Sequence, residues 1–254
     1  GTGVKVKDIA RYNDDFIEKR LNSAVANNKY YEARSENLGQ IESIFNELDS
    51  DGLNQTLNKF FNAFRELANQ PENETIRSVV KDNASLVVKD FHRIRETLDS
   101  QAKNIDKKIE TTVSDVNGLL HQIADLNQKI NTLEASQGET GDFRDQRDLA
   151  LRKLAENFKV HTYFDEKKRF VVNAQGIGTL VTGTNVQELA VIAENKDNSS
   201  NNMSGSKEIV LRDRPTQKVT DVFQSGELSS IIKIRNNDLR KLQDDMDNIA
   251  YEFA

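Results

Sequence analysis

The sequence predicts a mainly α protein, an elongated bundle of long helices with a small antiparallel β-hairpin subdomain inserted before the last helix. Three observations support this prediction. Apolar residues return at every third or fourth position through the middle of the chain. The 254 residues include only two prolines, so helices can run far without interruption. A hydrophobic fraction of 36% is low for a compact globule of this length, which favours an elongated shape.

The first expected helix carries apolar residues from Ile9 to about Leu48. The residue types of a turn follow it at Asp49–Gly52, so we expect the helix to end there. Because of its length, we predict that this helix is the main antiparallel partner of the long central helix.

A second, shorter helix is expected from Leu53 to Leu67. Its apolar positions include Phe60, Phe61 and Phe64. Contiguous exposed aromatic side chains are unfavourable in a soluble monomer. We therefore predict that these three rings form a core contact with the long helix, with an exposed interaction patch as the alternative.

The longest helix is predicted from about residue 72 to residue 134. Pro71 fits its first turn, where the missing N–H has no consequence. A helix of this length extends roughly 90 Å at about 1.5 Å per residue, which favours an architectural role over a catalytic one. Its apolar stripe comprises Val87, Phe91, Ile94, Leu98, Ala102, Ile105, Ile109, Thr112, Val116, Leu119, Ile123, Leu126, Ile130 and Leu133.

A further helix is expected after the Ser136–Gly141 interruption, with Asp142 as its N-cap and Phe158 near its end. It contains the densest polar cluster of the chain, Asp145, Gln146, Arg147 and Asp148. Paired carboxylates could serve acid–base chemistry if burial separated their pKa values. No pocket is implied nearby, so we predict a structural role for this motif in helix capping and ion pairing. This helix completes a helical core assigned to residues 1–158.

Residues 159–224 are predicted to form the β-rich subdomain, as one small antiparallel sheet. The expected strands are rich in β-branched and aromatic residues and are Val160–Phe164, Arg169–Asn173, Thr179–Thr182, Glu188–Ala193, Ile209–Leu211 and Val219–Phe223. The polar run at residues 195–206 is expected to be a mobile loop. Residues 225–254 then form a return helix that packs on the helical core.

Charge and composition exclude several classes of function. The formal net charge is -6 and the pI is near 5.3, whereas binding to a nucleic-acid backbone requires a basic surface. No apolar run reaches the ~18 residues of a membrane-spanning helix. The absence of cysteine removes thiolate chemistry and cysteine-based zinc sites. We therefore expect neither nucleic acid nor a membrane as a partner.

No set of residues indicates a catalytic, cofactor-binding or metal-binding site. His92, His121 and His161 are scattered, and none has a second metal ligand at a suitable spacing. Neither Lys-Ser nor Lys-Thr follows Gly176–Gly178, so we interpret these glycines as turn residues and not as a phosphate loop. We therefore predict that the chain is not an enzyme and uses no cofactor.

Several motifs taken together resemble those of the flagellar hook-associated protein 1 family, along essentially the whole chain. The most specific is the Asp145–Asp148 run after the long helix. Other matching residues are Gly1, Thr2, Gly3 and Val4, then Ile123 to Asn127, Leu180, Val181, Gly183, Gly226, Leu228 and Arg235. The chain departs from the family pattern in details of local capping, at Gly141, Phe143, Arg144 and Asn236.

The resemblance implies a structural, axial component of the bacterial flagellum, located outside the cell and exported without a cleaved signal peptide. It implies copies that form a ring at the tip of the hook, contact the hook protein and join the filament through the second hook-filament junction protein. A secretion chaperone would bind a C-terminal segment that this core fragment is expected to lack. The alternatives are another flagellar axial protein, such as flagellin or the second junction protein, and a coiled-coil signalling adaptor.

Overall fold

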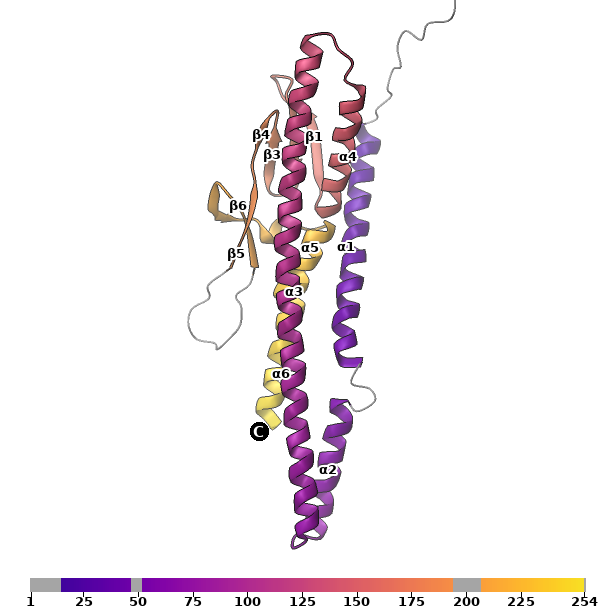
Figure 1. Ribbon diagram of the computed structural model, residues 1–254, viewed down its shortest axis with the longest axis vertical. Helices are drawn as coiled ribbons and strands as arrows, with labels where there is room; N and C mark the ends of the chain where they lie inside the picture. Colours follow the sequence, from indigo (N-terminus) through magenta and orange to yellow (C-terminus); the bar gives the residue numbers. More distant parts are fainter. Residues whose placement is uncertain (1–14, 47–51, 194–206, 254) are drawn as a thin grey trace, which may run out of the picture.

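The computed structural model describes residues 15–46, 52–193 and 207–253 (Figure 1). The protein is elongated, and one helix of 62 residues, α3 (Glu74–Ala135), runs along almost its whole length. The predicted unbroken central helix is therefore confirmed, as is the mainly α fold class. The loop expected at 195–206 and most of the turn expected at 49–52 lie outside the described residues.

Helix α3 begins at a side-chain cap. Asn73 Oδ1 accepts hydrogen bonds from the backbone N–H groups of Thr75 and Ile76, at 3.0 and 3.3 Å. Pro71 lies before this cap, in the turn that follows α2, so its expected position in the first turn of α3 is wrong. Asn73 determines where the helix starts because it satisfies N–H groups that have no partner within the helix.

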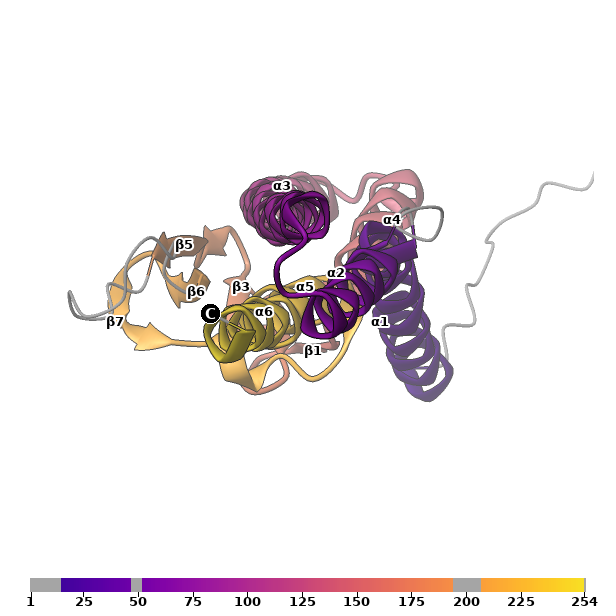
Figure 2. The ribbon, with the colours of Figure 1, turned by 90° about the horizontal axis from the view of Figure 1, so that it is seen from below.

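Helices α2 (Leu53–Asn69) and α4 (Gly141–Asn157) pack along opposite ends of α3, as Figures 1 and 2 show. Each forms an antiparallel hairpin with α3 through a short connection. Helix α1 (Asp15–Asn46) packs mainly on α4 and on α5 (Gly226–Lys233). The prediction that this first helix is the main partner of α3 is therefore wrong, because short connections favour packing between sequence neighbours.

Helix α4 begins two residues earlier than the sequence predicts, because its N-cap is Thr140 and not Asp142. Thr140 occupies the N-cap position, and its carbonyl accepts a hydrogen bond from the N–H of Arg144 at 3.0 Å. Asp142, the expected cap, lies instead within the first turn because the helix includes Gly141. A carboxylate in that turn still interacts favourably with the helix dipole.

Two small antiparallel sheets follow α4, where the sequence predicts one. The first has four strands in the order β1 (Val160–Phe164), β2 (Phe170–Ala174), β3 (Gly178–Thr182) and β4 (Asn185–Val186). The second has three strands, β5 (Leu189–Ala193), β6 (Lys207–Leu211) and β7 (Arg214–Lys218). Both sheets lie beside the half of α3 that leads to α4 (Figure 1).

The prediction of a strand at Val219–Phe223 is wrong. A 3-10 turn forms there at Thr220–Val222, and the strand that pairs with β6 on the side away from β5 is β7. Val219, Thr220 and Phe223 are buried, and this spacing suits a helical turn better than the alternation of a strand. All five residues of β7 are exposed, so no apolar pattern marks this strand in the sequence.

The chain returns along α3 through α5, a π turn (Ile234–Leu239) and α6 (Arg240–Phe253). The main core lies where α3, α4, α5 and the two sheets meet. Its large buried side chains include Ile105, Ile109, Leu120, Ile123, Leu154, Leu180, Leu189, Ile209, Leu228 and Ile231. One continuous core therefore connects the helical part to both sheets.

The predicted core contact is wrong for Phe61 and Phe64, whereas Phe60 is half-buried. Phe61 is 47% exposed and Phe64 is 54% exposed. Helix α2 buries two small residues, Thr56 and Ala63, in place of the aromatic rings. Small side chains at the contact allow α2 to approach α3 closely, and the larger rings are left at the edge.

Candidate functional site

Polar side chains join α3 to the return helix and to both sheets, and we call this group the core–sheet joint. Its members are Asp106, Asn117 and Asn127 on α3, Arg147 on α4, and Arg235 and Asn236 on the π turn. All except the half-buried Asn236 are buried. Buried polar groups are unfavourable unless they are paired, so their partners determine what the joint does.

An ion pair between Arg235 and Asp106 holds the return helix on α3. The guanidinium donates from Nε to Oδ1 at 2.6 Å and from Nη2 to Oδ2 at 3.2 Å, which is a two-point fork. Arg235 is 3% exposed and Asp106 is 8% exposed. The pair specifies one relative position of the two helices, because either charge alone would be strongly unfavourable in the interior.

The π turn presents polar side chains to three different elements. Arg235 reaches α3. Asn236 accepts from the backbone N–H of Lys207 in β6 at 3.1 Å and donates to its carbonyl at 2.9 Å. Asp238 accepts two hydrogen bonds from Arg34 of α1, at 2.9 and 3.3 Å. Because a π turn is wider than an α-helical turn, it spreads neighbouring side chains over more directions.

Asn117 holds the first residue of β5 in the same way. Its Nδ2 donates to the carbonyl of Leu189 at 2.8 Å, and its Oδ1 accepts from the N–H of Leu189 at 2.9 Å. The side-chain amide thereby satisfies the two backbone groups that a neighbouring strand would otherwise pair. Asn117 and Asn236 together anchor the second sheet to the helices.

Asn117→Ala is expected to lower the free energy of unfolding by about 2 to 3 kcal/mol, because both buried backbone groups of Leu189 lose their partners. Chemical denaturation of the purified chain measures this loss. Ser114→Ala, at an exposed position on α3, is the matched control and is expected to change stability by less than about 0.5 kcal/mol. Equal effects of the two substitutions would contradict the anchoring role.

Of the predicted polar motif, Arg147 belongs to the joint. Its guanidinium carbon lies 3.7 Å from the ring centroid of Phe170, and its Nη1 donates to Oδ1 of Asn127 at 3.0 Å. Nδ2 of Asn127 donates in turn to the carbonyl of Gly183 at 2.8 Å. Burial lowers the pKa of Arg147, and the carboxylate of Asp148 acts in the opposite direction. This series of contacts connects α4, α3 and the first sheet.

The other three residues of the motif lie further out on α4. Asp145 and Gln146 are exposed, and Asp148 is half-buried. The N-cap position belongs to Thr140, so capping is not the role of the motif. Its ion-pairing role stays a prediction.

Sequence reasoning did not predict that Asp106, Asn117 and Asn127 make buried polar contacts, although the sequence contains a signal for this. Each lies four residues after one buried apolar residue of α3 and three residues before the next. The flanking pairs are Ala102 and Ile109, Val113 and Leu120, and Ile123 and Ile130. A polar residue at such a position faces the core and needs a partner inside the protein.

The other candidate residues do not converge. His92, His121 and His161 lie on different turns or strands, and His121 Nε2 is 2.7 Å from Oε1 of Glu188. No three His, Asp or Glu residues in the described ranges are grouped so that they could hold a metal ion. Gly176 and Gly178 both have positive φ at the β2–β3 turn, which confirms their interpretation as turn residues.

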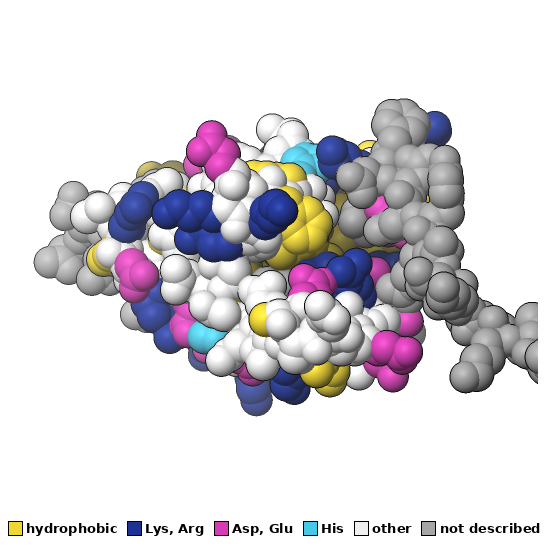
Figure 3. All heavy atoms as spheres, turned by 90° about the horizontal axis from the view of Figure 1, so that it is seen from above, with side chains coloured by type: hydrophobic (Ala, Val, Ile, Leu, Met, Phe, Trp, Pro, Cys, Tyr) yellow, Lys and Arg dark blue, Asp and Glu magenta, His cyan; other side chains and the backbone are white. Residues whose placement is uncertain are grey.

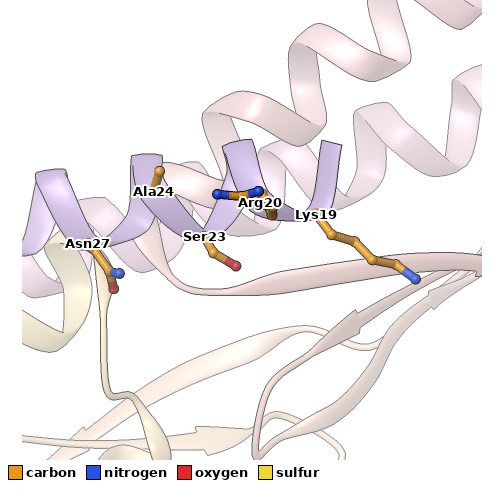
Figure 4. Close-up of a pocket in the computed structure, with 5 residues that line it drawn as sticks. All are labelled: Lys19, Arg20, Ser23, Ala24 and Asn27. Atoms are coloured by element: carbon orange, nitrogen blue, oxygen red, sulfur yellow. The ribbon is translucent and has the colours of Figure 1, made fainter. Parts of the chain in front are cut away.

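Figure 4 shows a depression of about 440 Å³ on the surface of α1. It is lined by Lys19, Arg20, Ser23, Ala24 and Asn27, which all come from this one helix. The side chains project along the helix and do not meet at a point, whereas a catalytic site requires groups that converge on a reacting atom. The depression therefore gives no support to an enzyme.

At the end of the molecule in Figure 3, Lys and Arg side chains lie among Asp, Glu and apolar side chains, so charges of both signs occur on that face. Among the helices of the described ranges, none combines the length and the apolar character that crossing a membrane demands.

A long helix packed against shorter ones, with two small sheets joined to it by buried polar contacts, defines an elongated helical protein. The family model for the "Flagellar hook-associated protein FlgK helical domain" matches residues 38–254, which include the whole core–sheet joint. The chain belongs to this family of flagellar hook-associated proteins. The resemblance indicated by the sequence motifs is thereby confirmed.

Individual relatives carry matching names. Flagellar hook-associated protein 1 of Bacillus subtilis (strain 168) is 31% identical along the whole of this chain, which covers 54% of that protein. The protein of the same name from Salmonella typhimurium is 23% identical, again along the whole chain, with 46% of it covered. The chain thus spans about half the length of these curated relatives.

A solved structure has the same fold. The flagellar hook junction protein FlgK from Burkholderia pseudomallei matches with a TM-score of 0.71 and 21% sequence identity. The match covers 85% of this chain and 39% of that one. At this level of identity the likeness concerns the fold.

Proposed function

We propose that the whole protein containing this chain is a structural axial component of the bacterial flagellum that joins the hook to the filament as a ring of subunits at the hook tip. The observation that carries the proposal is the family match over residues 38–254. The fold suits this role because α3 has buried contacts along most of its 62 residues, and such contacts oppose bending. The same match supports this function over flagellin, the second junction protein and a signalling adaptor.

The proposed partners are copies of the same protein in the ring, the hook protein and the second hook-filament junction protein. The relatives' names, which refer to the hook and to a hook junction, support a contact with the hook. A secretion chaperone would bind a C-terminal segment of the whole protein, which would be extracellular and exported without a cleaved signal peptide. We propose that the protein has no enzymatic activity and binds neither nucleic acid nor a membrane.

The chain would have three parts in this assembly. They are a helical core at residues 1–158, a β-rich subdomain at 159–224 and a return helix at 225–254. The ends of the helices support these limits, since α4 ends at Asn157 and α5 begins at Gly226. The core–sheet joint would keep the three parts in fixed positions.

Immunogold electron microscopy of flagella from the source organism tests the function. Antibodies raised against this chain are expected to label the boundary between hook and filament, and antibodies absorbed with the purified chain serve as the control. Label along the entire filament would favour flagellin. Label confined to cell bodies would favour the signalling adaptor and contradict the proposal.

A further inference from the structure

An aromatic face lies on the α2–α3 hairpin beside the last turn of α6. We define it by Phe60, Phe61 and Phe64 of α2 together with Val88 and Phe91 of α3. The ring centroid of Phe253 in α6 lies 5.4 Å from that of Phe60, 5.9 Å from that of Phe61 and 6.3 Å from that of Phe91. Rings at these separations attract one another beyond the effect of buried area alone, so this face already binds one turn of α6.

Helix α6 runs antiparallel to α3 along this face. Three contacts define its course: Gln243 with Asp99, Asp247 with Arg95, and Phe253 with Phe91. Residue numbers on α3 fall as those on α6 rise, so a further turn on the same course would lie beside earlier residues of α3. Figure 1 shows that the α2–α3 hairpin extends well past the last turn of α6, and Figure 2 shows α6 beside both helices.

The aromatic face continues past Phe253 with apolar side chains that no described residue covers. Phe64 lies one helical turn beyond Phe60 and is 54% exposed, and Val88 lies one turn before Phe91 and is 53% exposed. Adjoining exposed apolar side chains mark a surface that binds another segment. A helix with apolar residues at every third or fourth position would fit this face.

We propose that, in the whole protein, the chain after Ala254 extends α6 antiparallel to α3 and covers Phe64 and Val88. The uncovered part of the face is continuous with the existing α6–α3 interface. The curated relatives are about twice as long as this chain, which covers 54% and 46% of them, so a whole protein of that length has further residues that could supply such a segment. A segment joined to α6 is held at high effective concentration and binds with less loss of freedom than a separate molecule.

Cysteine accessibility tests this proposal in the whole protein, after any cysteine outside this segment has been replaced by serine. This chain has no cysteine, so Val88→Cys reports on the aromatic face alone. Leu86→Cys is the matched control, because the exposed fractions are similar, 48% for Leu86 and 53% for Val88. Leu86 lies roughly 200° around the α3 axis from Val88, on a different face of the helix. Both cysteines are expected to react with a maleimide at similar rates in the 254-residue chain. In the monomeric whole protein, Val88→Cys should react at least about tenfold more slowly, and Leu86→Cys at an unchanged rate.

Equal reaction of Val88→Cys in the two lengths of protein would overturn the proposal. Protection that appears only as the protein concentration rises would overturn it too, because the covering segment would then belong to a second copy. Phe64→Cys on α2 is a second probe and should be protected together with Val88→Cys. Far-UV circular dichroism verifies that each variant keeps its helical structure.

Discussion

Gly226→Ala is expected to prevent cooperative folding of the chain, or to lower the free energy of unfolding by more than about 4 kcal/mol. Gly226 has a φ of +84°, which residues other than glycine rarely adopt. A Cβ at this position would lie 2.0 Å from the carbonyl oxygen of Asn157 and 2.5 Å from the nitrogen of Phe158. Both are backbone atoms at the end of α4 and cannot rotate away. The substitution must therefore separate α5 from α4, and urea denaturation followed by circular dichroism measures the loss.

Gly118→Ala provides a control with the opposite sign. Gly118 lies in the interior of α3, and a Cβ there meets nothing within 4 Å. Alanine at an exposed interior position of a helix is more favourable than glycine by about 1 kcal/mol, so this variant is expected to be more stable than the parent. If Gly226→Ala unfolded like the parent chain, the close approach of α5 to α4 would be refuted.

Arg235→Met is expected to lower the free energy of unfolding by about 3 to 5 kcal/mol, because it leaves the Asp106 carboxylate buried without its forked partner. Methionine retains much of the apolar volume of arginine, so the loss reports mainly on charge and hydrogen bonding. The measurement is again urea denaturation, compared with the parent chain at the same pH and salt concentration.

The double variant Asp106→Leu, Arg235→Met is expected to recover most of this loss, because two apolar side chains can replace a buried ion pair at little cost. Arg34→Met on α1 is the matched control, because the partner of Arg34, Asp238, lies on the same π turn as Arg235. This substitution breaks the ion pair between Arg34 and Asp238, whose side chains are 31% and 30% exposed, respectively. It is expected to lower the free energy of unfolding by about 1 kcal/mol or less. A double variant as unstable as Arg235→Met would show that the specific pair, and not the isolated charge, provides the stability.

The helices are predictable from the sequence because their signal is local. The apolar stripe of α3 repeats with the period of the helix, and each turn lies within a few residues of the next. Helix ends are less predictable, because several neighbouring residues compete for the cap. The N-cap of α3 is Asn73, although Pro71 was expected in its first turn. The N-cap of α4 is Thr140, although Asp142 was expected there.

Strand β7 shows where local patterns fail. All five of its residues are exposed and only Pro215 is not polar, so the sequence carries no alternation of apolar side chains. These residues become a strand because β6 offers an edge with unpaired backbone groups. The nearby apolar residues Val219 and Phe223 instead enter the core from either side of a 3-10 turn.

The core–sheet joint depends on contacts between distant parts of the chain. Arg235 and Asp106 are 129 positions apart, and Asn117 and Leu189 are 72 positions apart. Helical periodicity places Asp106 and Asn117 next to the apolar stripe, but it does not identify what each one binds. The same applies to Arg147, whose motif is evident in the sequence while its contacts with Phe170 and Asn127 are not.

Residue order within short segments is enough to predict the mainly α class, the single long helix and the motifs of the flagellar hook-associated family. Contacts between distant segments are needed to establish which helices pack on α3, that the strands form two sheets, and that the phenylalanines of α2 lie beside α6. Periodicity indicates only which face of a segment is buried. The partner of that face is selected by the fit of surfaces and polar groups between segments far apart in the chain.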